Sequence, residues 1–189
     1  MKRTGVAGVM VVAQLVLVVS STLGVAQEAK SVQAVLKAPG GRTLAPEFAL
    51  KDTTGKIVRL SEYRGRVVLL DFWATTCGGC IQEIPMLIEV EKAYERRGLS
   101  TIGVSEDIAY AGLKNADEAW DRVRPFVRDR QVPYPVVMGD SRVTAAYDIK
   151  ALPLTYLVDA KGRVAATYGG VVERANLEAN IKALLAESR

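Results

Sequence analysis

The fold is decided by the stretch Phe72-Trp73-Ala74-Thr75-Thr76-Cys77-Gly78-Gly79-Cys80-Ile81-Gln82-Glu83-Ile84-Pro85. It follows the apolar run Val67-Val68-Leu69-Leu70, which is typical of a buried parallel strand, and it leads into an amphipathic segment, Ile84 to Arg97, that predicts a helix. The chain has 2 cysteines among its 189 residues. Both therefore lie at a strand-to-helix turn, with Cys77 at the start of the helix and Cys80 one turn in.

This placement predicts redox chemistry. Free backbone N–H groups and the positive end of the helix dipole stabilise a thiolate at the first turn and lower its pKa, so Cys77 is expected to be the nucleophile. Cys80 shares the same helix face and can attack a mixed disulfide formed on Cys77, which releases a reduced substrate and closes a Cys77–Cys80 disulfide.

A cysteine pair can also serve as a structural bridge or as a metal site. A structural bridge that closes so small a loop stabilises a fold by only about 2 kcal/mol, against about 3 for fifteen residues. Structural zinc usually takes four ligands, and this chain offers two thiols and no histidine. Two-coordinate Cu(I) stays open as an alternative, because thiolates are soft ligands. No cofactor or other metal is expected.

The motif resembles that of the TlpA/ResA-like extracytoplasmic thiol-disulfide oxidoreductases of the thioredoxin superfamily (redoxin, or AhpC/TSA-like, domain), usually written W-A-T-W-C-G-P-C-R-x-E-x-P. Further on, Leu152-Pro153-Leu154-Thr155-Tyr156-Leu157-Val158-Asp159 with Lys161-Gly162 is similar to the cis-proline loop, strand and hairpin of that family. The resemblance covers about residues 44 to 187. The chain differs from the family pattern at three positions, where Thr76 replaces tryptophan, Gly79 proline and Ile81 a basic residue.

The resemblance implies a thioredoxin-like fold and a protein thiol-disulfide oxidoreductase, with reduction of exported proteins as the favoured direction and disulfide formation or Cu(I) delivery as alternatives. It implies that substrate contacts Leu152, cis-Pro153, Trp73 and Thr76. The expected partners are disulfide-bearing exported proteins and a membrane or soluble thiol electron donor, and the protein is expected to be a monomer. A peroxidase of the peroxiredoxin type would need P-x-x-x-T-x-x-C, but Leu70 and Ala74 occupy the first two of these positions.

Two acids are candidates for the site. Asp71 interrupts the apolar strand six residues before Cys77, in the sequence D-F-W-A that thioredoxins also have at this offset. A buried carboxyl there would have a raised pKa and could accept a proton from Cys80; the alternative is a carboxylate that faces water at the strand end. Glu106 follows the predicted strand Leu99–Ser105, at the sheet edge where open α/β folds place their sites, but it could equally be an ordinary surface acid.

The N-terminus predicts export. Lys2 and Arg3 precede an apolar segment, and Gly24 and Ala26 suit a cleavage site, so residues 1–26 have the pattern of a signal peptide. The same stretch is long enough to serve as an uncut membrane anchor. Residues 27–43 predict a linker and residues 44–189 a thioredoxin-like domain. The protein is thus expected to be periplasmic or secreted, with the inner membrane as the site of any anchoring.

Charge and element order complete the prediction. The formal net charge of +4, which would fall to +2 if Lys2 and Arg3 were removed, is too balanced to indicate a nucleic-acid partner. Flanking a Thr53-Thr54-Gly55 turn, two short apolar segments predict an N-terminal hairpin. After the redox strand, strands are expected at 99–105, 133–138, 154–158 and 163–168, and helices at 117–130, 141–147 and 173–186. This order predicts an α/β fold with a central mixed sheet and helices on both faces.

Overall fold

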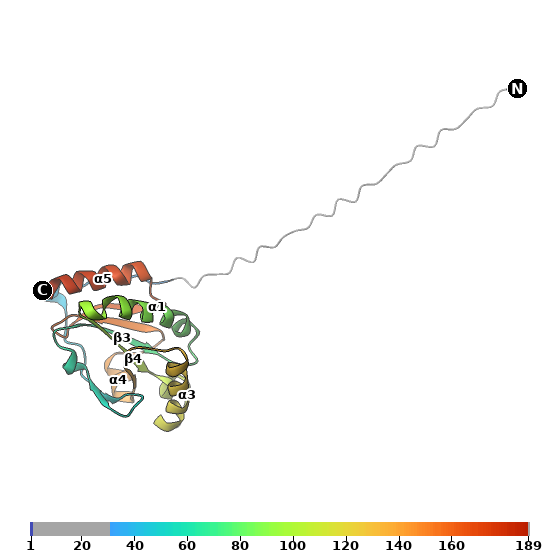
Figure 1. Ribbon diagram of the computed structural model, residues 1–189, viewed down its shortest axis with the longest axis horizontal. Helices are drawn as coiled ribbons and strands as arrows, with labels where there is room; N and C mark the ends of the chain where they lie inside the picture. Colours follow the sequence, from blue (N-terminus) through green and yellow to red (C-terminus); the bar gives the residue numbers. More distant parts are fainter. Residues whose placement is uncertain (2–30, 189) are drawn as a thin grey trace.

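A five-stranded mixed sheet forms the centre of the protein (Figure 1). The computed structural model describes Met1 and residues 31–188. The strand order is β5-β4-β3-β6-β7, with β3 parallel to β4, β4 parallel to β5, and β6 antiparallel to both β3 and β7. The strands are β3 (Val67–Trp73), β4 (Leu99–Ser105), β5 (Val136–Met138), β6 (Leu154–Val158) and β7 (Val164–Gly169).

The central strand β3 carries the redox motif to one edge of the sheet. All seven of its residues are buried, because its apolar run is covered on both faces. In register, Asp71 lies beside Gly103 of β4 on one side and Thr155 of β6 on the other. The strand therefore places a carboxyl group inside the sheet, two residues before its end.

Helices and a hairpin cover the two faces of the sheet. The helices α1 and α5 pack side by side on one face, where apolar side chains of both helices contact β3 (Figure 1). The N-terminal hairpin and the short helix α4 pack on the other face. The elements outside the sheet are η1 (Pro39–Gly41), β1 (Ala49–Lys51), β2 (Ile57–Arg59), η2 (Leu60–Tyr63), α1 (Gly78–Tyr94), η3 (Glu95–Arg97), α2 (Asp107–Tyr110), α3 (Ala116–Asp129), α4 (Ser141–Ala146) and α5 (Arg174–Glu187).

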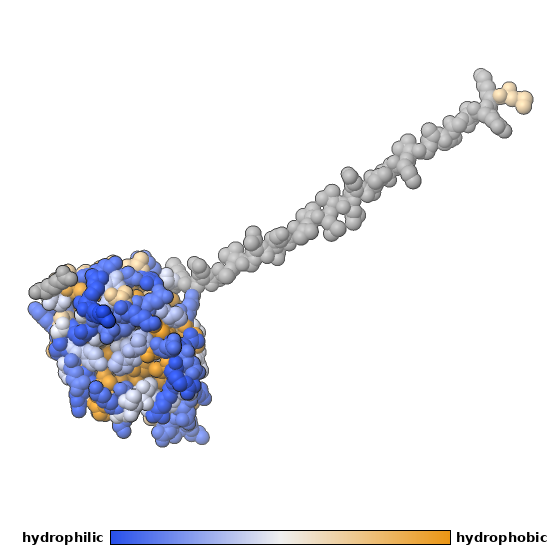
Figure 2. Space-filling view, in the orientation of Figure 1, coloured by the Kyte–Doolittle hydropathy of each residue, from blue (hydrophilic) through white to orange (hydrophobic). Residues whose placement is uncertain are grey.

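This architecture confirms the predicted fold class, including the extra N-terminal hairpin. The helix that follows the motif begins as expected, with Cys77 as its N-cap, and Gly98 ends η3 in the left-handed conformation with φ 110°. Polar and charged side chains cover most of the face drawn in Figure 2, and an apolar area lies between them.

Residues 31–43, which the sequence predicts to be part of a linker, are attached to the domain. Val32, Ala34 and Leu36 alternate inward against the cluster under α5, while their neighbours are exposed. The backbone of Val32 exchanges hydrogen bonds with Val171 and Glu173, at 2.7 and 2.9 Å. This alternation of inward and outward side chains is typical of an extended strand. The hydrogen-bond partners of the segment lie more than a hundred residues later in the chain.

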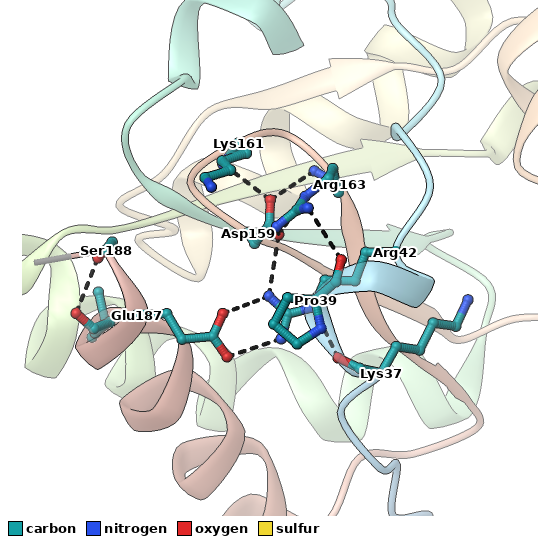
Figure 3. Close-up of polar contacts among 9 residues, drawn as sticks. Lys37, Pro39, Arg42, Asp159, Lys161, Arg163, Glu187 and Ser188 are labelled. Carbon is teal, nitrogen blue, oxygen red and sulfur yellow. Dashed lines mark hydrogen bonds and ion pairs between the residues drawn. The ribbon is translucent and has the colours of Figure 1, made fainter.

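A buried ion-pair cluster fastens this segment to the C-terminal helix (Figure 3). The Arg42 guanidinium, whose side chain is 1% exposed, donates to Asp159 at 3.2 Å and to both oxygens of Glu187 at 2.6 and 2.9 Å. Arg163 pairs with the same Asp159 at 2.7 Å. The cluster joins the start of the domain, the β6–β7 turn and the end of α5.

The predicted signal or anchor lies outside the described residues. Of the helices that the structure does describe, none combines the length and the apolar character needed to cross a bilayer.

Candidate active site

Cys77 and Cys80 form a disulfide at the first turn of α1. Cys77 is the N-cap, and its sulfur accepts a hydrogen bond from the backbone N–H of Cys80 at 3.2 Å. The side chains are 3% and 1% exposed, whereas Thr76 and Gly78 beside them are exposed. The pair is therefore covered except at the loop that precedes the helix, and Cys77 is the sulfur next to that loop.

The Leu152–Pro153 loop lies against the disulfide turn, and its X–Pro bond is cis, as the family resemblance implied. A Cβ atom on Gly79 would lie 3.2 Å from Cδ of Pro153 and 3.2 Å from Cγ2 of Val171. Leu152 packs against the same apolar cluster as the two cysteines. The glycine at position 79 thus lets the proline ring approach the helix closely.

Asp71 is buried in β3, two residues before the end of the strand, as the functional interpretation of the sequence requires. Its side chain is 2% exposed, and its Oδ1 has no hydrogen-bond partner among the described residues. Burial, and after it the charge of Glu83, raises the pKa of Asp71 well above its ordinary value. The alternative of a carboxylate facing water is excluded by this burial.

Glu83 is a second buried carboxyl, to which the sequence analysis assigned no role. It projects from α1 one turn after Cys80, is 2% exposed, and accepts hydrogen bonds from the Val172 backbone at 2.7 Å and the Thr155 hydroxyl at 3.3 Å. Burial raises its pKa to about 7 against these two bonds, which lower it. The signal was present in the family pattern, which has a glutamate at this position.

Asp71 and Glu83 are neighbours through the sheet register. Asp71 lies opposite Thr155, and the Thr155 hydroxyl donates to Glu83. Two carboxyl groups in one buried space disfavour each other's ionised form, so the pair holds a proton at pH values where free carboxyls have lost theirs. Such a pair can accept and return a proton near neutral pH.

The two predicted substrate contacts in the motif differ in position. Thr76 is exposed beside Cys77. Trp73 is 2% exposed and stacks on Phe126 of α3, with ring centroids 4.9 Å apart. The side chain of Trp73 is thus part of the core, because β3 is buried on both faces up to its last residue.

Of the two acids after β4, Asp107 holds the loop of the motif. Its carboxylate accepts hydrogen bonds from the Thr75 backbone at 3.1 Å, from the Thr75 hydroxyl, and from the Ser105 hydroxyl at 2.8 Å. Glu106, the predicted candidate, is 3% exposed and so is not a surface acid, and its carboxyl accepts from the Thr144 hydroxyl at 2.7 Å. The sequence alone did not separate these two neighbours.

The described residues offer the cysteine pair no third side chain that could complete a metal site. Within residues 31–188, no three histidine, cysteine, aspartate or glutamate side chains come together in a way that could hold a metal ion.

A cysteine pair that caps a helix, in a mixed sheet of this order, defines a thiol-disulfide oxidoreductase with a thioredoxin-like fold. The AhpC/TSA family model matches residues 42–167. The chain belongs to this family, as a TlpA/ResA-like member of the thioredoxin superfamily.

Known relatives agree with this assignment. The chain is 33% identical over 129 residues to the thiol-disulfide oxidoreductase ResA of Bacillus subtilis (strain 168). The aligned region covers 68% of this chain and 66% of that protein. It is 31% identical over 140 residues to the ResA of Geobacillus kaustophilus (strain HTA426), covering 74% and 75%. A solved structure of a putative thiol:disulfide interchange protein DsbE from Chlorobium tepidum aligns with a TM-score of 0.65 at 29% identity, covering 76% of this chain and 96% of that one.

Proposed function

We propose that the protein reduces disulfides in exported polypeptides through a mixed disulfide on Cys77. One observation carries the proposal: Cys77 caps α1 beside an exposed loop, and the strand and helix that meet at the motif each hold a buried carboxyl, Asp71 in β3 and Glu83 in α1. The N-cap position supplies the N–H groups that stabilise a thiolate, and the carboxyl pair supplies a proton acceptor. Export is supported by the signal pattern of residues 1–26.

The reaction starts from the reduced protein. The Cys77 thiolate attacks one sulfur of the substrate disulfide, and the other substrate sulfur leaves as a thiolate and takes a proton. Cys80 then gives its proton to the carboxyl pair of Asp71 and Glu83, and its thiolate attacks Cys77. The second substrate sulfur leaves as a thiolate and takes the proton back from the carboxyl pair, and the Cys77–Cys80 disulfide forms. Two electrons have passed to the substrate, and a membrane or soluble dithiol must return two electrons before the next cycle.

Substrate docking is assigned to the surface next to Cys77. Thr76 is exposed on one side of the cysteine, and the Leu152–Pro153 loop lies on the other side. An extended polypeptide that pairs with the backbone of this loop would bring its disulfide toward Cys77.

The direction of electron flow is tested by the equilibrium reduction potential of the dithiol against glutathione. We expect a value near that of thioredoxin, about −270 mV, together with catalysed reduction of insulin by the dithiothreitol-recycled protein. A potential near −120 mV would instead identify an oxidant that forms disulfides. Absence of insulin reduction together with a Cys77 pKa at or above about 8.5 would reject the proposal.

A further inference from the structure

The backbone stretch Val171–Glu173, between β7 and α5, lies between the N-terminal segment and the buried carboxyl of Glu83. On one side, the Val32 N–H donates to the Val171 carbonyl at 2.7 Å, and the Glu173 N–H donates to the Val32 carbonyl at 2.9 Å. These two bonds form a parallel bridge between Val32 and Val172. On the other side, the Val172 N–H donates to Oε2 of Glu83 at 2.7 Å. Val32 therefore holds the residues before and after the N–H group that binds Glu83.

The same stretch is joined to the redox site at two further points. The Gly170 N–H donates to the Pro153 carbonyl at 3.0 Å. Val171 lies against the first turn of α1, where a Cβ atom on Gly79 would be 3.2 Å from its Cγ2. Val32 supports this region from outside, since a Cβ atom on Gly170 would be 3.2 Å from Cγ1 of Val32. The start of the domain thus contacts the backbone that lines the dithiol turn.

Polar contacts with α5 keep residues 31–34 in this place. The Ala34 N–H donates to Oδ1 of Asn176 at 3.0 Å, and Nδ2 of Asn180 donates to the Ala34 carbonyl at 2.9 Å. The side chains of Val32 and Ala34 are half-buried against the apolar cluster under α5. Because both backbone groups of Val32 and of Ala34 are bonded, the segment forms a fixed support and not a loose linker.

We propose that residues 31–34 position the Glu83 carboxyl for the proton transfer from Cys80, by fixing the backbone on both sides of the Val172 N–H. A hydrogen bond weakens steeply when its donor turns away from the acceptor, so a fixed donor holds the carboxyl in one orientation. Without the Val32 bonds, the stretch Val171–Glu173 loses its outer support. The effect on turnover rests on the proposed function, whereas the effect on the carboxyl itself does not.

Few charged groups face Glu83, so its protonation reports on this contact. Asp71 faces it through the register of β3 and β6, and Cys80 precedes it by one turn on α1. Tyr134, which precedes β5, stays neutral near pH 7 because burial raises its pKa well above 10. The other charged side chains of these elements have partners of their own: Glu91 binds Thr101, Glu173 binds Gln33, and Arg174 pairs with Glu89 and Glu178.

Val32→Pro in the full chain tests the proposal, because proline has no N–H to donate to Val171. The matched control is Val35→Pro, at an exposed position whose N–H donates to no group among the described residues. The measurement is a carbon-13 NMR titration of the Glu83 carboxyl in the oxidised proteins, assigned by its absence in Glu83→Gln. Burial raises the pKa of Glu83 to about 7, and the backbone hydrogen bond opposes this rise. We expect a midpoint near 7 in wild type and control, and one higher by about 0.5–1 unit in Val32→Pro.

The pH profile of peptide-disulfide reduction separates this inference from the proposed function. The carboxyl pair must lose a proton before it can accept one from Cys80, so the acidic limb of kcat/KM should move to higher pH in Val32→Pro. An unchanged Glu83 midpoint in folded Val32→Pro, or an equal rise in Val35→Pro, overturns the inference and leaves the proposed function intact. If the wild type reduces no peptide disulfide, the proposed function is overturned, and the NMR titration still decides the inference.

Asn176→Ala is a milder variant that decides the question if Val32→Pro does not fold. It removes the acceptor of the Ala34 N–H and leaves the backbone of Val32 unchanged. A rise in the Glu83 midpoint in the same direction supports the proposal, and a midpoint equal to that of the wild type overturns it.

Discussion

At the scale of single residues, the proposed proton transfer depends on two carboxyl groups that the fold keeps away from water. Asp71 and Glu83 are both buried next to Thr155, and burial is the main cause of the raised pKa of both. A carboxyl whose pKa is raised toward that of a thiol is matched to thiol chemistry, because its proton affinity then approaches that of the group from which it accepts the proton.

Asp71→Asn is predicted to slow disulfide reduction by about 100-fold, since an amide cannot accept the Cys80 proton. The pH profile of kcat/KM should change as well, because one of the two coupled groups is gone. The measurement is peptide-disulfide reduction from pH 5 to 9, with circular dichroism to show that the fold is kept. Asp129→Asn, at an exposed ion pair of α3, is the control. A wild-type profile in Asp71→Asn would contradict this role.

Glu106 is predicted to make stability depend on pH. Burial raises its pKa from 4.5 to about 7, so between these values the folded protein holds a proton that the unfolded chain has lost. Its contribution is therefore fully present below about pH 4.5 and declines as the pH rises to 7, by on the order of 3 kcal/mol. Urea unfolding should show this decline in the wild type and a flatter curve in Glu106→Gln. Parallel curves for the two proteins would count against the raised pKa.

Sequence reasoning located the reacting sulfurs but not all of their surroundings. Cys77, Cys80 and Pro153 could be placed because local motifs mark them. The family pattern marks a glutamate at position 83, but its burial and its hydrogen bonds could not be derived, because its partners Thr155 and Val172 lie far along the chain. Whether Asp71 is buried likewise depends on strands and helices that cover it from elsewhere in the sequence.

At the scale of elements, the two glycines of the first turn of α1 have different surroundings. A Cβ on Gly78 would meet no atom within 4 Å, whereas one on Gly79 would press on Pro153 and Val171. Position 79 thus joins the helix to the Leu152–Pro153 loop, and position 78 does not.

Substitution by alanine at both positions tests this difference. Gly78→Ala is predicted to stabilise the protein by up to about 1 kcal/mol, because alanine is the better helix former. Gly79→Ala is predicted to be less stable than Gly78→Ala by at least about 1 kcal/mol, because its methyl group overpacks the contact. Urea unfolding of the two oxidised variants measures the difference. Equal free energies of unfolding for the two variants would show that the close contact at Gly79 does not affect stability.

Most elements could be predicted from local patterns. β4 and β6 begin and end at the predicted residues, because each is a short run of mainly apolar and β-branched or aromatic residues that follows a turn residue, Gly98 or Pro153. The attachment of residues 31–37 could not be predicted, since their short apolar alternation has meaning only beside β7 and α5, which come much later in the chain.

At the scale of the whole molecule, Arg42 connects the beginning of the domain to its end. Arg42→Ala is predicted to lower the free energy of unfolding by about 3 kcal/mol, because Asp159 loses a buried partner and Glu187 its guanidinium. Arg128→Ala, which removes an exposed pair with Asp129, should change it by less than about 1 kcal/mol. Chemical unfolding measures both. If both variants lost a similarly small amount of unfolding free energy, the Arg42 ion pairs would not be what holds residues 31–43 to the domain.

The central claim is that Cys77 exchanges disulfides with a polypeptide and that Cys80 resolves the product. The most direct test is to mix the reduced Cys80→Ser protein with a disulfide-bearing peptide and to measure the mass of the adduct. We predict a stable one-to-one mixed disulfide on Cys77, and none when Cys77→Ser is used in its place. No adduct with Cys80→Ser, or an equal yield of adduct with Cys77→Ser, would contradict the account.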